Sequence, residues 1–124
     1  MKNNPVVWFE IPVNNLERAK AFYDAVLDID IQIVDLGGPR MGMFPAEQGA
    51  TGASGGLMEY DSYVPSYDGT LVYLSCEDLQ NELDRIEAAG GKILRPKSQI
   101  SPEHGYMGVI EDSEGNRVAL HSTK

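Results

Sequence analysis

The same short pattern occurs twice in this sequence, about half a chain apart. An apolar stretch runs into an Asn-Leu or Asp-Leu pair that opens a segment with helical spacing, first at Asn15-Leu16 and again at Asp78-Leu79. The two pairs are 63 positions apart in a chain of 124 residues. A repeat of this length indicates two copies of one structural unit. It predicts two similar modules, residues 1–63 and 64–124, with any binding cleft between them.

Length and charge limit the classes of protein to consider. A chain of 124 residues with 42% hydrophobic residues is long enough for one domain, 1–124, with a buried core. Its formal net charge is −9, which disfavours binding to nucleic acid or to anionic membranes. We therefore expect a single domain that binds neither.

The single cysteine and the apolar segments bear on the compartment. Cys76 has no second cysteine for an intrachain disulfide, which fits a reducing environment. The start of the sequence, Met1–Pro5, lacks the long apolar run of a secretory signal, and no segment approaches the ~20 apolar residues of a membrane span. These features predict a cytoplasmic protein.

The first module begins with an alternating segment at 6–13. One side of this expected strand is uniformly apolar and should pack on a helix, whereas the other side carries Trp8 and Glu10. Asn15 is placed to cap a helix over 16–27, whose apolar residues recur at helical spacing. A Gly/Ala/Ser-rich loop at 45–56 is expected to form a flexible rim. Further strands are predicted at 31–35, 41–44 and 57–60.

The second module repeats this order. Asp78 is placed to cap a helix that Gly90 and Gly91 end. In the last expected strand, Ala119 and His121 point away from the apolar side. The predicted elements are a strand at 71–76, a helix at 79–89, a strand at 92–94, a mobile loop at 95–105, and a hairpin of 106–111 and 117–122.

The predicted order is therefore strand, helix and three strands, twice. Each helix covers the apolar face of its own sheet, so the opposite faces can curve towards each other and enclose a cleft. The predicted cleft residues share the sides that point away from the helices: Trp8, Glu10, Leu71, Tyr73, Ala119 and His121.

The whole chain resembles the vicinal oxygen chelate superfamily, also called the glyoxalase/bleomycin resistance/dioxygenase fold, and in particular small bacterial proteins related to lactoylglutathione lyase. The segments that carry the resemblance are Trp8–Val13, Gly69–Leu74, Ala88–Lys92 and Glu114–Ser122. The resemblance implies an α+β fold in which two βαβββ modules form a cup-shaped, incomplete mixed β-barrel with the helices outside. It also implies that members of this length form homodimers.

The usual chemistry of this superfamily needs a divalent metal held by His or Glu on the first, fourth, fifth and eighth strands. The resemblance places three of these positions at Trp8, Leu71 and Ala119, whose side chains cannot bind a metal. The fourth falls near Leu57. We therefore expect no metal and no other cofactor, and glyoxalase activity does not follow from the fold.

Glu10 and His121 are the candidate catalytic residues of the cleft. A carboxylate beside an imidazole can act as a general acid/base pair. The same two residues can instead orient a ligand or neutralise each other, or form a weak metal site together with Glu59. Trp8 and Tyr73 are interpreted as a stacking floor for a planar ligand. His104 is expected to be a solvated loop residue.

Three hypotheses for the function remain open. The first is a glyoxalase-like protein, most simply a homodimer, that binds a small molecule in the cleft without a metal. The second is a metal-independent isomerase or lyase that uses Glu10 and His121 as acid and base. The third is a drug-binding resistance protein of the bleomycin-binding kind, whose acidic surface would attract a cationic drug.

Overall fold

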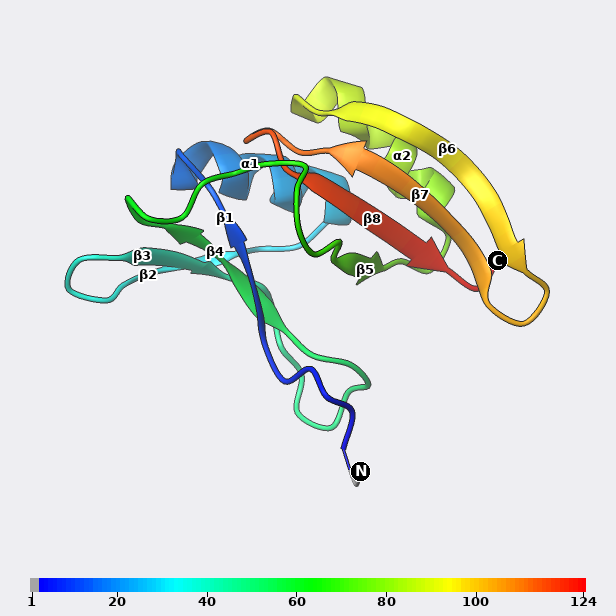
Figure 1. Cartoon of the computed structure of the whole chain (residues 1–124), viewed down its shortest axis with the longest axis horizontal. Coiled ribbons are helices and arrows are strands. Elements are labelled where there is room, and N and C mark those ends of the chain that lie inside the picture. The colour runs from blue at the N-terminus through cyan, green and yellow to red at the C-terminus, as the bar shows by residue number, and fades with distance from the viewer. Residues whose placement is uncertain (1–2) are drawn as a thin grey trace.

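A computed structural model describes residues 3–124, and the first two residues of the predicted domain lie outside the described residues. The predicted order of elements, β-α-β-β-β, is present twice (Figure 1). The elements are β1 (Phe9–Pro12), α1 (Leu16–Leu27), β2 (Gln32–Asp35), β3 (Arg40–Met43), β4 (Gly55–Glu59), β5 (Tyr73–Ser75), α2 (Leu79–Ala89), β6 (Lys92–Ser101), β7 (Gly105–Glu111) and β8 (Arg117–Ser122).

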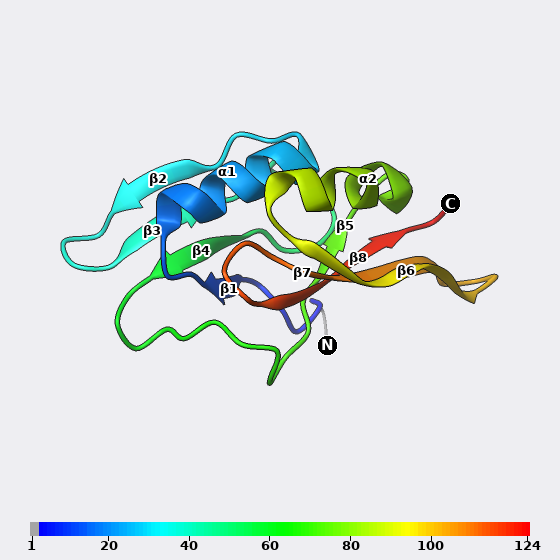
Figure 2. The same cartoon turned by 90° about the horizontal axis from the view of Figure 1, so that it is seen from above.

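Each half forms one four-stranded mixed sheet. The strand orders are β1-β4-β3-β2 and β5-β8-β7-β6, and in each sheet the first and last strands of the half pair in parallel. β1 and β5 are therefore edge strands. Among residues 3–124 no strand pair joins the two sheets, so they do not close into a barrel. Both helices lie on the same side of the sheets, as Figure 2 shows.

The helices begin and end at the predicted residues. The Asn15 side chain accepts a hydrogen bond from the Arg18 amide at 3.0 Å, and Asp78 accepts one from the Gln80 amide at 3.0 Å. Each cap satisfies an amide that the first helical turn leaves free. α2 ends at Gly90, whose φ of 104° is the left-handed conformation that glycine tolerates.

One hydrophobic core runs through both halves, on the helix side of the sheets. Strand residues that face the helices belong to it, including Ile11, Leu57, Leu74, Val118 and Leu120. Their neighbours in sequence point to the helix-free side. The predicted alternation is therefore confirmed in β1, β5 and β8. In the described part of the chain no helix is long and apolar enough to cross a membrane.

The turn between β7 and β8 ties the second half to the first. The Asn116 side-chain amide donates to the Pro12 carbonyl at 2.7 Å. The buried Tyr23 hydroxyl of α1 donates to Asp112 at 2.6 Å. These bonds fix one end of the second sheet against β1 and α1.

Several predicted segments differ from the structure: β4 begins at Gly55, inside the loop expected at 45–56, and β5 covers only Tyr73–Ser75 of the strand expected at 71–76. The expected mobile loop 95–105 is instead the continuation of β6 to Ser101, followed by a short turn. The strand accommodates Pro96 because β6 is an edge strand whose register shifts between Arg95 and Ser98. At the other end, β1 begins only at Phe9, and Val7, expected to face the helix, is 80% exposed.

Candidate functional site: two faces and a connecting pocket

Trp8 and Glu10 lie side by side on the helix-free side of β1. The Trp8 indole donates a hydrogen bond to Glu10 Oε2 at 3.2 Å, and the Tyr63 hydroxyl donates to Glu10 Oε1 at 2.9 Å. The bond to the carboxylate raises the pKa of Tyr63, which keeps its hydroxyl a donor. Trp8 remains 39% exposed. Glu10 is thus a fixed acceptor beside an open indole ring.

The second set of predicted residues lies on β5 and β8. Tyr73 is opposite Ala119 in the parallel pair, and Ser75 is opposite His121. Tyr73 is 50% exposed, whereas Ala119 is fully buried. Leu71 precedes β5 and is half-buried. Tyr73, Ala119 and His121 therefore share one face of the second sheet.

His121 is oriented by a backbone carbonyl that the sequence did not point to. Its Nε2 atom lies 2.6 Å from the carbonyl oxygen of His104, and a carbonyl can only accept, so Nε2 carries the proton. The Nδ1 atom is then free to accept a proton or a hydrogen bond. The His104 ring is itself held by the Ser101 hydroxyl at 2.8 Å from Nδ1. His104 was expected to be a solvated loop residue. That expectation did not include the contact of its backbone carbonyl with His121.

A single chain does not bring the two sets together. Within residues 3–124 no hydrogen bond joins Glu10 to His121, and neither of the two pockets described below is lined by both residues. The six predicted cleft residues form two groups on the helix-free sides of two different sheets.

The residues present do not fit the metal of the superfamily. Trp8, Leu71 and Ala119 offer no ligand atoms. On β4, Leu57 faces the core rather than the open side, where Met58 lies instead. Glu59 is consequently on the helix side, and no three His, Cys, Asp or Glu side chains within 3–124 form a group that could hold a metal ion.

Glu59 has a structural role in place of the ligand role considered for it. Its Oε2 accepts from the Leu16 amide at 2.8 Å at the start of α1, and its Oε1 pairs with Arg40 at 2.9 Å. The parity of β4 explains this: the residue two positions after a core residue also faces the helix.

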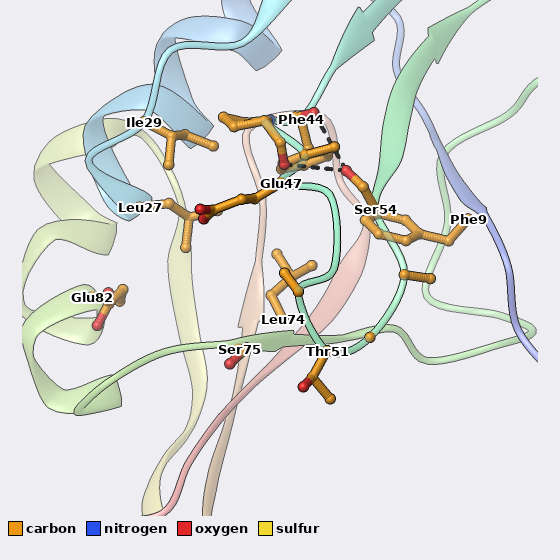
Figure 3. Close-up of a pocket in the computed structure, with 15 residues that line it drawn as sticks. Phe9, Leu27, Ile29, Phe44, Glu47, Thr51, Ser54, Leu74, Ser75 and Glu82 are labelled. Carbon is orange, nitrogen blue, oxygen red and sulfur yellow. Dashed lines mark hydrogen bonds between the residues drawn. The ribbon is translucent and has the colours of Figure 1, made fainter. Parts of the chain in front are cut away.

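A pocket of about 340 Å³ lies beside the loop at 45–54, which lines much of it (Figure 3). The loop residue Ser54 donates from its hydroxyl to the carbonyls of Phe44 and Pro45, at 3.3 Å each. Phe9, Leu74 and Glu82 complete the wall from β1, β5 and α2. None of the six predicted cleft residues lines this pocket.

A smaller pocket of about 230 Å³ connects the two halves. It lies between β1, the start of β8 and the segment 64–72, which crosses the helix-free side in Figure 2. Glu10 lines it from β1 and Arg117 from β8. Arg117 was not among the predicted site residues, although its position two residues before Ala119 places it on the same side of β8.

Two βαβββ modules with open sheets define a protein with the glyoxalase fold, and residues 3–124 contain no group of side chains that would form the conventional metal site. A family model for the Glyoxalase/Bleomycin resistance protein/Dioxygenase superfamily matches residues 6–120. The chain therefore belongs to this superfamily, as the resemblance in the sequence indicated. No curated protein matches the sequence.

Solved structures share the fold. Glyoxalase I from Zea mays is 21% identical, with a TM-score of 0.72 over 96% of this chain and 46% of that one. A glyoxalase/bleomycin resistance protein from Albidiferax ferrireducens T118 is 17% identical, with a TM-score of 0.68 over 96% and 98% of the two chains. TnmS3, an antibiotic binding protein from Streptomyces sp. CB03234, is 22% identical, with a TM-score of 0.67 over 100% and 99%.

These identities show a shared fold and nothing finer. This chain spans about half the length of the Zea mays protein.

Proposed function

We propose that this protein binds a small organic molecule in a cup that two copies of the chain complete, without a chelating metal. The observation that carries the proposal is the separation of Trp8 and Glu10 from Tyr73 and His121 on two helix-free faces. Twofold symmetry would set the first face of one copy against the second face of the other and create two equal sites.

Exposed apolar groups at the two edge strands support a second copy. Val6, Val7 and Trp8 are 63%, 80% and 39% exposed around the start of β1, and Tyr73 is 50% exposed on β5. Unpaired strand edges with exposed apolar side chains favour association with another chain. A homodimer formed through these edges would cover both groups.

The groups available for binding favour a planar molecule with hydrogen-bonding edges. Trp8 and Tyr73 offer aromatic faces for stacking. Glu10 supplies a fixed acceptor, and His121 supplies Nδ1 as a second one. The free thiol of Cys76 supports a reducing, cytoplasmic location for this protein.

A metal-independent isomerase or lyase is the second candidate, and the orientation of His121 favours it. A ring whose Nε2–H is fixed by a carbonyl has its Nδ1 ready to take a proton, and Glu10 of the other copy would serve as the partner acid or base. The Glu10→Gln substitution separates the two functions. Retained ligand affinity with lost turnover in this variant supports the enzyme, whereas loss of the ligand in the variant, together with no conversion by the wild-type protein, supports the binding protein.

An antibiotic-binding function is the third candidate. TnmS3 is described as an antibiotic binding protein and matches this chain over its whole length. The net charge of −9 would attract a cationic drug to the cup. A screen of cationic antibiotics by thermal shift, with and without 0.5 M salt, tests this candidate against neutral planar compounds.

The two-chain cup is tested by mass and by complementation. We expect light scattering to give twice the mass of one chain. Ligands are identified by native mass spectrometry of gently purified protein or by a thermal-shift screen. Glu10→Gln and His121→Gln should each lose the ligand.

When the two variants are mixed and re-equilibrated, about half of the dimers should be mixed, and each mixed dimer should regain one of its two sites, so the mixture should regain about a quarter of the ligand binding. The exposed Glu87→Gln serves as a matched control and should keep full binding. A monomeric protein, or a mixture that regains no binding, contradicts the proposal.

A further inference from the structure

The pocket that connects the two halves contains an arginine without an ionic partner. The side chain of Arg117 is half-buried, and its Nε atom is shielded from solvent and has no hydrogen-bond acceptor. Arg117 forms no ion pair with any of residues 3–124. A partly buried guanidinium whose charge is not compensated within the described residues is costly, so an anionic group that enters the pocket and pairs with Arg117 would be stabilised.

The neighbours of Arg117 are already engaged. Glu111 is opposite Arg117 in the β7–β8 pair, but the two form no ion pair, and the Glu111 carboxylate accepts a hydrogen bond from the Tyr67 hydroxyl. Asn116 uses its side-chain oxygen for the Ser66 amide and its nitrogen for Pro12 and Asp112. The residues nearest in the sheet therefore leave the guanidinium available.

Acidic groups line the same pocket from other elements. Glu10 accepts one hydrogen bond on each oxygen, from Trp8 and Tyr63, which leaves each oxygen a further lone pair. Asp68 is exposed and forms no ion pair within the described chain. Val64 and Val72 supply apolar wall between these charges.

We propose that this pocket binds a zwitterionic molecule of the amino-acid class, with its carboxylate on the Arg117 guanidinium and its ammonium group towards Glu10 and Asp68. A guanidinium matches a carboxylate through two parallel N–H donors. A purely anionic ligand would be opposed by the two acids and by the net charge of −9. The inference rests on the proposed function, because Glu10 serves both sites, but this pocket lies within one chain.

Three probes with the same phenylethyl body test the charge pattern. Phenylalanine carries both charges, 3-phenylpropionate lacks the ammonium group, and phenethylamine lacks the carboxylate. Binding is followed by the NMR signal of the Trp8 indole N–H, which is unique because the chain has one Trp. We expect phenylalanine to bind at least tenfold more tightly than either truncated probe.

Variants of Arg117 assign the carboxylate contact. In Arg117→Gln the affinity for phenylalanine should fall tenfold or more, to that for phenethylamine, while the affinity for phenethylamine stays within twofold. Arg117→Lys should recover part of the loss. The control is Arg95→Gln, which removes an exposed guanidinium two strands away in the same sheet and should leave all three affinities unchanged.

Several outcomes overturn the inference: no binding of phenylalanine, equal binding of phenylalanine and phenethylamine, or an unchanged phenylalanine affinity in a folded Arg117→Gln protein. Circular dichroism and thermal melting verify folding. The two proposals fail separately. A monomeric protein that binds phenylalanine through Arg117 contradicts only the two-chain cup. A dimer whose phenylalanine affinity does not depend on Arg117 contradicts only this inference.

Discussion

The guanidinium of Arg18 holds the carboxylate of Glu114, with Nε 2.7 Å from Oε2 and Nη2 2.9 Å from Oε1. The same carboxylate accepts the amides of Asn14 and Asn15 at 2.9 and 2.8 Å. Glu114 belongs to the β7–β8 turn and the other three residues to the start of α1. One buried carboxylate therefore links the second module to the helix of the first.

Glu114→Gln should destabilise the protein. The Glu114 side chain is 0% exposed, and the substitution removes its charge and places an amide against four donor groups, those of Arg18, Asn14, Asn15 and Ser113. Loss of a buried, charge-assisted network typically costs about 2 to 3 kcal/mol. Urea denaturation of both proteins measures the difference. An unchanged midpoint would mean that this link carries no stability.

The effect of Glu114 should depend on pH. Burial alone would raise the pKa of Glu114, but hydrogen bonds from Arg18 and from the amides of Asn15 and Asn14 outweigh it and hold the pKa below its usual 4.5. A lowered folded-state pKa gives stability that is complete above about 4.5 and is lost as pH falls through the folded value. The gap between wild type and Glu114→Gln should therefore narrow below pH 4.

Glu17 provides the control for that measurement. Hydrogen bonds from Arg40 lower its pKa to about 2, but this pair is open to solvent. Solvent and salt screen exposed ion pairs, so such pairs contribute little to the free energy of unfolding. Glu17→Gln should therefore leave the stability nearly unchanged across the same pH range.

Tyr23→Phe tests the second link between the modules. Burial first, and then the charge of Asp112, raise the pKa of Tyr23 well above its usual value, so the hydroxyl stays a donor. Losing this bond should cost about 1 kcal/mol, since Asp112 keeps three other donors. Thermal melting measures this loss of stability. Tyr60→Phe is the control, because Tyr60 is an exposed tyrosine.

The loss of stability at alkaline pH is a separate test of the hydrogen bond between Tyr23 and Asp112. A raised folded-state pKa means that the Tyr23 contribution is complete below about pH 10 and is lost as pH rises further. Tyr23→Phe should lose stability less steeply than wild type there. An identical alkaline slope in both proteins would contradict the assignment.

Sequence patterns predicted what the core dictates. Trp8, Glu10, Ala119 and His121 point away from the helices because Ile11, Val118 and Leu120 must face them, and the strand period of two leaves no other arrangement. Asn15 and Asp78 were predicted as caps because the first turn of a helix needs acceptors.

Contacts between residues far apart in the sequence could not be predicted from these patterns. The carbonyl that orients His121 comes from His104, which lies in the turn between β6 and β7. Glu111 lies opposite Arg117 in the sheet but forms no ion pair with it, and its carboxylate accepts a hydrogen bond from Tyr67, 44 positions earlier in the chain. The strand predicted at 92–94 continues to Ser101, and this continuation was missed because Pro96 suggests a break, whereas an edge strand with a shifted register tolerates it.

Gly42→Ala should destabilise β3 through overpacking. A Cβ at this position would lie 2.8 Å from Ile31 Cγ2 and 3.1 Å from Leu16 Cδ1, both on fully buried side chains. Overpacking of this kind costs about 1 to 3 kcal/mol. Gly38→Ala is the matched control, because nothing lies within 4 Å of its Cβ. Equal urea midpoints for the two variants would contradict the packing argument.

Cys76 should react slowly with alkylating reagents in the folded protein. Burial, followed by the charge of Glu82, raises the pKa of the Cys76 thiol to about 12. The thiolate is the reactive form, so alkylation by iodoacetamide at pH 8 should be roughly 100-fold slower than in urea. Glu82→Gln should speed the reaction by removing the negative charge, whereas Glu87→Gln should not. Equal rates in folded and unfolded protein would contradict the assignment.

His121 should be found as one defined tautomer. Its Nε2 lies 2.6 Å from the His104 carbonyl oxygen, which requires the proton on Nε2 and leaves Nδ1 bare in the neutral ring. Long-range ¹H–¹⁵N NMR at pH 8 distinguishes the two nitrogens directly. We expect the Nε2–H form for His121, assigned by its absence in His121→Gln.

The base or acceptor role proposed for His121 depends on this result. If the spectrum shows the Nδ1–H form, the ring cannot donate to the carbonyl, and Nδ1 is unavailable to a ligand in the cup. The proposed isomerase or lyase would then lack a base. The stacking of a planar ligand on Trp8 and Tyr73 would not be affected.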